Sequence, residues 1–246
     1  MLELMHLTGY SKPPVPAGQQ EFTTPGSHYF TVPEGVYSLM IVCQGGGALP
    51  VIIPSSKYAE GGQGGYTRYR NNVAVKPGDI LNVLVAAKKI GGSYAISNTM
   101  FTNTYGIGNS SSVYLSGVGF LVTAPGGRAT NYSAVGVGVE PISMSAISGG
   151  SSMVGSDRAG GYAAGYTTQG VSLGSGNQGG KGLSLQTTAL TGVPTTVDGR
   201  AYGGGGAVTF TSSAMTVGSG AQGFVRILWD GDSPTKRSIP NNMASV

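Results

Sequence analysis

Short apolar stretches separated by turn-forming residues fill the first half of the chain. Residues 21–24, the dipeptide Pro25-Gly26 and residues 27–32 predict a strand, a tight turn and a second strand. Residues 36–44, VYSLMIVCQ, predict a third strand, in which Cys43 behaves as a small buried hydrophobic residue. This pattern is typical of a β protein.

A second hairpin signal follows. Residues 66–75 alternate in part between polar and apolar positions, the turn at 76–79 (KPGD) reverses the chain, and residues 80–85 return it. Further short strands are expected at 112–116, 120–124, 207–211 and 224–229, with a turn at 116–119. No run of ten or more residues combines a helical period with a helix-forming composition. The predicted fold class is all-β, an antiparallel β-sandwich with glycine-rich segments and almost no α-helix.

Glycine accounts for 44 of the 246 residues, which is about 18% against a usual value of about 7%. Glycine at this density disfavours helix by about 1 kcal/mol per residue. The formal net charge is only +4 and charged residues are 10% of the chain. Because disorder usually requires low hydrophobicity together with high net charge, we expect the chain to fold. Residues 20–125 should be mainly sandwich, and the later half glycine-rich layers with loops.

Cofactor and nucleic-acid binding have weak support. Residues 174–179 and 218–223 match the dinucleotide pattern G-x-G-x-x-G, but such matches arise by chance in a glycine-rich chain, and no helix is expected after either. Lys181 suggests a phosphate-binding loop, but Gly182 stands where Ser or Thr must hold magnesium. The basic residues are scattered despite a pI of about 9.1. We expect no cofactor and no nucleic-acid partner.

Catalysis also has little support. The two histidines are His6, near the N-terminus, and His28, in a predicted hairpin, which are poor positions for a Ser-His-Asp relay. A single cysteine excludes a multi-cysteine metal site. Asp157 and Asp198, both in glycine-rich loops, are the candidates for a pair of carboxylates that cleaves polysaccharide, and this alternative stays open. We expect no enzyme activity and no metal.

The ends of the chain differ from the body. Residues 1–19 form a proline-rich leader whose apolar residues have no core of their own, and residues 232–246 form a tail. The leader is either a floppy terminus or a peg that docks on a larger assembly. The N-terminus lacks the basic region of a signal peptide, and no stretch approaches 18 apolar residues. Residues 20–231 are predicted to form one domain.

The order of these segments resembles a glycine-rich domain found at the ends of bacteriophage tail fibres and in phage adhesins. The matching segments are 22–48, 61–85, 110–127 and 218–229. They contain a V-P-x-G-V turn with a strand and a glycine cluster, a glycine cluster followed by strand, P-G and strand, and closing glycines before a last strand ending in Trp229. Residues 48–60 and 133–146 depart from the family, which often has longer glycine runs at such places.

The resemblance implies an extracellular protein of the virion tail that binds a host-surface receptor, an outer-membrane protein or a glycan, non-covalently. In such adhesins glycine segments form polyglycine helices packed side by side, with variable loops at the distal end. Only glycine lets unpaired backbones approach closely enough to satisfy one another. There are two alternatives. The chain could be a structural virion protein without a receptor, or it could be a polysaccharide-degrading enzyme. The sequence leaves homo-oligomerisation open.

Aromatic residues in glycine- and serine-rich segments indicate where a receptor would bind. Tyrosine among small polar residues is typical of binding surfaces, because it supplies area and a hydroxyl at low entropy cost. The alternative for each tyrosine is that it covers a glycine layer. The residues expected to contact the receptor are Tyr94, Met100, Phe101, Tyr105, Arg128, Tyr132, Met144, Tyr162 and Tyr166.

Overall fold

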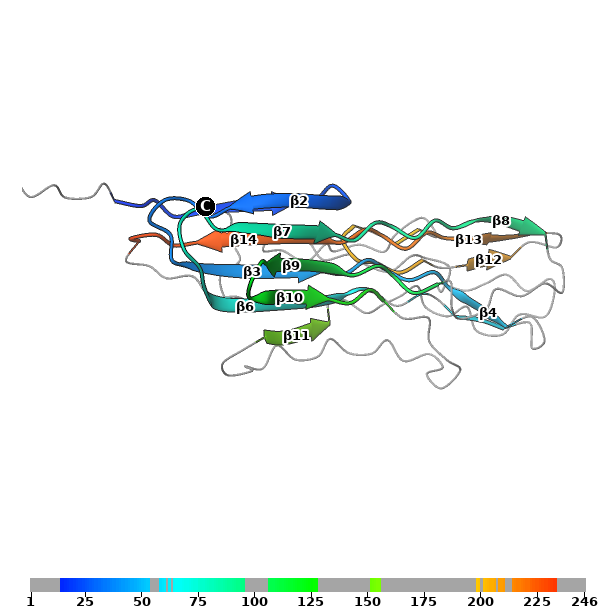
Figure 1. Ribbon diagram of the computed structural model, residues 1–246. Helices are drawn as coiled ribbons and strands as arrows, with labels where there is room; N and C mark the ends of the chain where they lie inside the picture. The colour runs from blue at the N-terminus through cyan, green and yellow to red at the C-terminus, as the bar shows by residue number, and fades with distance from the viewer. Residues whose placement is uncertain are drawn as a thin grey trace, which may run out of the picture.

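The protein is an elongated all-β molecule. The computed structural model describes residues 14–53, 58–60, 62, 64–95, 106–127, 151–155, 198–199, 201–206, 208–210 and 214–233. None of these residues is helical, and accordingly they contain no helix that could cross a membrane. Two large sheets occupy one half of the molecule and two small sheets the other, joined by long extended segments (Figure 1). The predicted all-β, antiparallel fold class is confirmed.

The two large sheets lie against each other. Sheet A has the order β1 (Gly18–Phe22), β14 (Phe224–Trp229), β3 (Ser38–Gln44), β6 (Tyr66–Ala74) and β11 (Ser151–Gly155). Sheet B has the order β10 (Gly119–Ala124), β9 (Ser111–Leu115), β7 (Ile80–Val85) and β2 (Gly26–Thr31). Neighbouring strands in both sheets run antiparallel. The arrangement is sandwich-like.

The core between the sheets is built from alternate residues of both. Leu81, Val83 and Val85 of β7 are buried in it, while the residues between them face outward. Ile41 of β3 and Ile227 of β14 enter the same cluster from sheet A. Each fully buried side chain of this size contributes about 1.5–3 kcal/mol. This shared burial holds the two layers together.

Two connections that we predicted as hairpins instead cross between the sheets. β1 pairs with β14 and β2 with β7, so the turn at Pro25-Gly26 carries the chain from sheet A to sheet B. The turn at 76–79 does the same between β6 and β7, which also lie in different sheets. A tight turn between two alternating strands has the same sequence signature whether the second strand pairs with the first or folds over it. The strands were predicted correctly, but their pairing was not.

Other predicted strands are confirmed. β9 and β10 form the expected hairpin, with Gly119 opposite Leu115, and β14 spans the predicted 224–229. The sequence did not reveal five short strands. They are β4 (Val51–Ile53), β5 (Tyr58–Glu60), β8 (Gly92–Ala95), β11 and β13 (Ala214–Val217). The strand predicted at 207–211 is β12 (Val208–Phe210).

Sheet A is buried on both faces, which explains the nearly continuous apolar run of β14. Val225 and Ile227 enter the core between the sheets, whereas Phe224 and Leu228 belong to a second cluster on the other face. Arg226 lies on that second face and is only 1% exposed. A buried guanidinium is costly unless it is paired.

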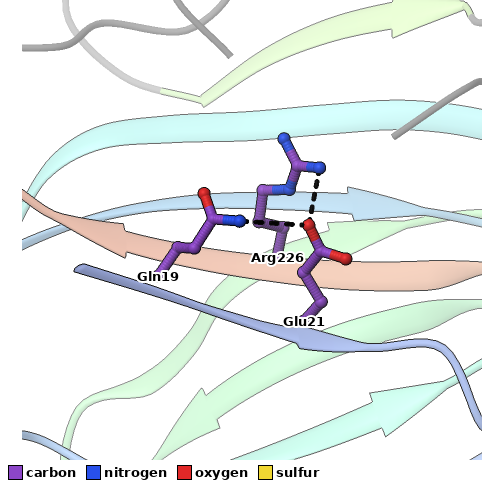
Figure 2. A network of polar contacts seen from close by, with 3 residues as sticks. All are labelled: Gln19, Glu21 and Arg226. Atoms are coloured by element: carbon purple, nitrogen blue, oxygen red, sulfur yellow. Dashed lines mark hydrogen bonds and ion pairs between the residues drawn. The ribbon is translucent and has the colours of Figure 1, made fainter. Parts of the chain in front are cut away.

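Glu21 of β1 supplies the partner of this arginine. Glu21 lies directly opposite Arg226 in the β1–β14 register, and its Oε1 atom is 2.6 Å from the arginine Nη2. The Gln19 side-chain amide donates a hydrogen bond of 3.3 Å to the same Oε1 (Figure 2). This contact fixes the edge strand β1 onto β14.

Beyond the large sheets, seven backbone segments run side by side and hydrogen-bond to one another. They are residues 45–49, 62 with 64–66, 86–91, 106–109, 125–127, 199 with 201–206, and 219–223, and we call them the glycine bundle. The Gly47 N–H donates to Ala221 O at 2.8 Å, and the Gly206 N–H donates to Ala48 O at 2.9 Å. The bundle thus draws on both halves of the chain. Residues 20–125 supply most strands of the two large sheets, as expected, but bundle segments also come from this half, and β14 of sheet A comes from the second half.

Hydrogen bonds in the bundle repeat every third residue. Gly46 and Leu49 both donate to the segment 106–109, whereas Gly47 between them donates to a different segment. Gly62 and Gly65, again three apart, both donate to the segment 203–206. An extended helix with three residues per turn and no internal hydrogen bonds has this pattern. The hydrogen-bond spacing at these residues is the one expected of packed polyglycine-type helices.

A buried polar cluster joins sheet A to the bundle. The Gln44 Nε2 donates to Gly65 O at 2.8 Å, and its Oε1 accepts from the Thr67 hydroxyl. The Ser111 hydroxyl donates to Gln44 O at 2.6 Å and accepts from the Ala86 N–H at 2.9 Å. The cluster thereby satisfies backbone groups where regular strand pairing ends.

We predict that Gly47→Ala destabilises the fold by about 3 kcal/mol, at the upper end of overpacking costs. A Cβ at Gly47 would collide with the Gly204 carbonyl, which is backbone and cannot rotate away. The control is Ala221→Gly in the same bundle, which should cost only about 1 kcal/mol. Thermal melting and urea denaturation measure both, and equal losses would contradict close packing at Gly47.

We also predict that Glu21→Ala costs about 2–3 kcal/mol, because it leaves the buried Arg226 charge without its carboxylate. The value lies toward the low end because the Glu21 side chain is 29% exposed. Gln19→Ala, which removes only the longer bond to the same oxygen, should cost clearly less. Urea unfolding of the two variants decides, and the prediction fails if their stabilities match.

Candidate functional site

One end of the molecule holds both ends of the described chain. The Val15 N–H donates to the Asp232 carboxylate at 2.7 Å, and the Asp232 N–H donates to Val15 O at 3.0 Å. Gly18 lies opposite Trp229 in the β1–β14 register. We call this end the base.

The opposite end, which we call the tip, consists of short strands. β8, β13 and β12 form a three-stranded antiparallel sheet, and β4 pairs with β5 (Figure 1). Residues 54–57 link β4 to β5, and residues 211–213 link β12 to β13. Residues 96–105 follow β8, whose last residue Ala95 lies opposite Ala214. All three segments lie outside the described residues, but the described strands that they join are at the tip.

Ser219 connects the tip to the glycine bundle. Its N–H donates to the Asp198 carboxylate at 2.6 Å, and its carbonyl accepts from the Gly199 N–H at 2.8 Å. Its hydroxyl accepts from the Gly91 N–H at 3.1 Å, directly before β8. Ser219 thus ties its own stretch of chain to two others just below the tip sheet, which fixes the start of β8 and the end of β13.

The structure places one of the predicted receptor-contacting residues. Tyr94 lies in β8 at the tip, opposite Met215 of β13. Met100, Phe101 and Tyr105 fall in the segment that follows β8 and lie outside the described residues. The same holds for Arg128, Tyr132, Met144, Tyr162 and Tyr166, of which Arg128 directly follows the described Gly127. Except for the position of Tyr94, the predicted site stays a prediction.

The structure adds positions that sequence reasoning missed. Phe210, Met215 and Tyr94 lie in one row across β12, β13 and β8. Ile90 and Ile107, next to bundle glycines, are exposed. The only sequence signal for the two isoleucines was an isolated large apolar residue beside glycine. The row could not have been found, because it depends on pairing between strands that are 120 residues apart.

The described candidates for catalysis make local hydrogen bonds. Asp198, one of the two carboxylates considered for polysaccharide cleavage, accepts the Ser219 N–H, while Asp157 lies outside the described residues. The His28 Nε2 lies 2.7 Å from Thr24 O, within hydrogen-bonding distance inside its own turn. Among the residues that the structure describes, no three His, Cys, Asp or Glu side chains gather as metal ligands.

A groove with a volume of about 420 Å³ lies at the base. Its walls include Tyr37, Met40 and Asn72, with Asp230 and Asp232 from the end of the described chain. Asn72 has a positive φ of 54°. The groove is at the opposite end from the tip, next to the point where the chain enters and leaves the body.

Comparison of the chain with protein-family models and with curated proteins gives no match.

We predict that Cys43 does not react with thiol reagents in the native protein. The residue is fully buried in the core, and this burial raises the pKa of its thiol. A raised pKa keeps the thiol protonated at neutral and mildly alkaline pH, whereas the thiolate is the reactive form. Ellman's reagent at pH 8 should label no thiol in the folded protein and one in guanidinium. Rapid labelling without denaturant would contradict the burial.

Proposed function

We propose that this protein is a bacteriophage tail-fibre or tail-tip adhesin that binds a host-surface receptor non-covalently through its tip. The observation that carries the proposal is the polarity of the molecule. Both described chain ends meet at the base, where Val15 and Asp232 bond to each other. The strands that carry 54–57, 96–105 and 211–213 lie at the other end. A protein mounted through its base would present these segments outward.

The glycine bundle suits the spacer that such a protein needs. Its segments are tied to one another by backbone hydrogen bonds of 2.7–3.0 Å rather than by ion pairs. Backbone bonds of this kind do not weaken with salt as exposed ion pairs do. A stiff support also lowers the entropy cost of binding, because the tip strands are ordered before the receptor arrives.

The base suits attachment to a larger particle. The leader, residues 1–19, is expected either to be a floppy terminus or to dock on a larger assembly by contacting another virion protein. It is described from residue 14 onward: Val15 packs against the core at the base, and Gly18 begins β1. The acidic groove lies beside it, with Asp230 and Asp232 in its walls. A mounting partner would therefore meet the leader and the groove together, well away from the tip.

The proposal predicts that the purified protein competes with phage for adsorption to host cells. Alanine substitution of Tyr94, Phe101 or Tyr105 should weaken binding by about 30-fold where the residue is a central anchor, because such anchors contribute about 2 kcal/mol. The control is Tyr37→Ala, an exposed tyrosine of the base groove. It should leave adsorption unchanged.

The measurement pairs host-cell adsorption with thermal melting for each variant. If the wild-type protein does not inhibit adsorption, the chain is a structural component of the virion rather than an adhesin. Release of reducing sugars from host envelopes would indicate an enzyme instead. If the protein inhibits but all three tip variants bind normally, the predicted residues are wrong while the function stands.

A further inference from the structure

The outward face of sheet B is apolar and uncovered. Six large apolar residues on it are between 36% and 70% exposed. They are Tyr29 of β2, Ile80 and Leu84 of β7, Tyr114 of β9, Val118 of the β9–β10 turn, and Phe120 of β10. We call this set the apolar face. It holds six of the nine large apolar residues that are exposed among the described residues.

Strand register concentrates the aromatic residues in a single row. Tyr29 lies opposite Asn82, Asn82 opposite Tyr114, and Tyr114 opposite Phe120. The Tyr114 and Phe120 rings contact edge to face, with centroids 5.4 Å apart and an interplanar angle of 70°. Leu84, between Ser27 and Ser112, extends the face on the next row. The row crosses all four strands of the sheet.

The apolar face carries no charge. The remaining outward positions of the four strands are Ser27, Thr31, Asn82 and Thr123, together with Ser112, which is buried between its neighbours. An uncharged face has no electrostatic attraction for a polyanion, such as a phosphorylated polysaccharide. It also sets up no repulsion between two copies of a chain whose net charge is +4. Charge therefore favours a neutral partner and permits a second copy.

The size of the face fits a protein interface. Taking about 150–250 Å² for a whole aromatic side chain, the exposed parts of the six residues amount to roughly 600 Å². That is the upper end of what monomeric proteins leave uncovered. A standard interface buries about 800 Å² per partner, so the face and its rim of Ser, Thr and Asn supply most of what a stable dimer needs.

We propose that the apolar face binds the same face of a second copy of this chain. The pairing is isologous, as in most homodimers, with each Phe120 packing against the partner's sheet B. Two sheets in this arrangement lie about 10 Å apart with their strands nearly aligned, which lets the outward side chains interdigitate. The face lies on the strands of the base half, so the tip strands remain uncovered in the dimer (Figure 1).

The test is the mass of the full chain in solution, by light scattering coupled to gel filtration and by sedimentation equilibrium. We expect a species of twice 24.8 kDa for the wild type. Phe120→Asp and Tyr29→Lys, at opposite edges of the sheet, each place a charge in the interface and should weaken association at least 100-fold. The control is Ile90→Asp, an exposed isoleucine outside the apolar face, which should stay dimeric.

Several results would overturn the proposal. One is a wild-type protein that is monomeric at about 100 μM, a hundred times a 1 μM dissociation constant. Another is a dimer that Ile90→Asp disrupts as strongly as Phe120→Asp does. A third is a monomer that binds a neutral glycan through Phe120, which would make the sugar the occupant. A cooperative melting transition in each variant confirms that it folds, although loss of the dimer should lower the melting temperature. The adsorption assay with the tip variants tests the proposed function separately from this dimer.

Discussion

Hydrogen bonds between backbones that have no regular strand partner are the constraint on which this structure depends. An extended helix with three residues per turn makes no bonds within itself, so its N–H and C=O groups must be satisfied by neighbouring segments. Gly46, Gly47 and Leu49 show how this works, because each donates to a neighbouring segment. Such closeness leaves no space for a Cβ at Gly47 or Gly126. The glycine-rich composition of these segments follows from this requirement.

The large sheets satisfy the same backbone groups by regular strand pairing and are held against each other by side-chain burial. The two arrangements meet at Gln44. Before this residue, β3 pairs without a break with β14, and with β6 apart from one register shift between Leu39 and Ile41. After it, the chain enters the bundle with Gly45 bonded to Tyr66. The amide of Gln44, together with Thr67 and Ser111, provides bonds that neither regular pattern supplies. A change there would affect both halves of the molecule.

Individual strands could be predicted from the sequence, but their partners could not. The alternation at 80–85 and the apolar run at 224–229 were sufficient to locate β7 and β14. The position of β14 between β1 and β3 depends on contacts between residues about 200 positions apart. A local sequence pattern contains no information on such contacts. For the same reason the row from Tyr29 to Phe120 was missed. The predicted receptor residues depended on composition alone, and among them the structure places only Tyr94, at the tip.

The meeting of Val15 and Asp232 has a consequence for how such a body can be moved between proteins. Because the chain enters and leaves at neighbouring points, the whole body can be spliced into a surface loop of another polypeptide without stretching either. Genetic exchange could therefore transfer it as a cassette. Only the two short junctions next to Gly18 and Trp229 would have to be compatible with the new host chain.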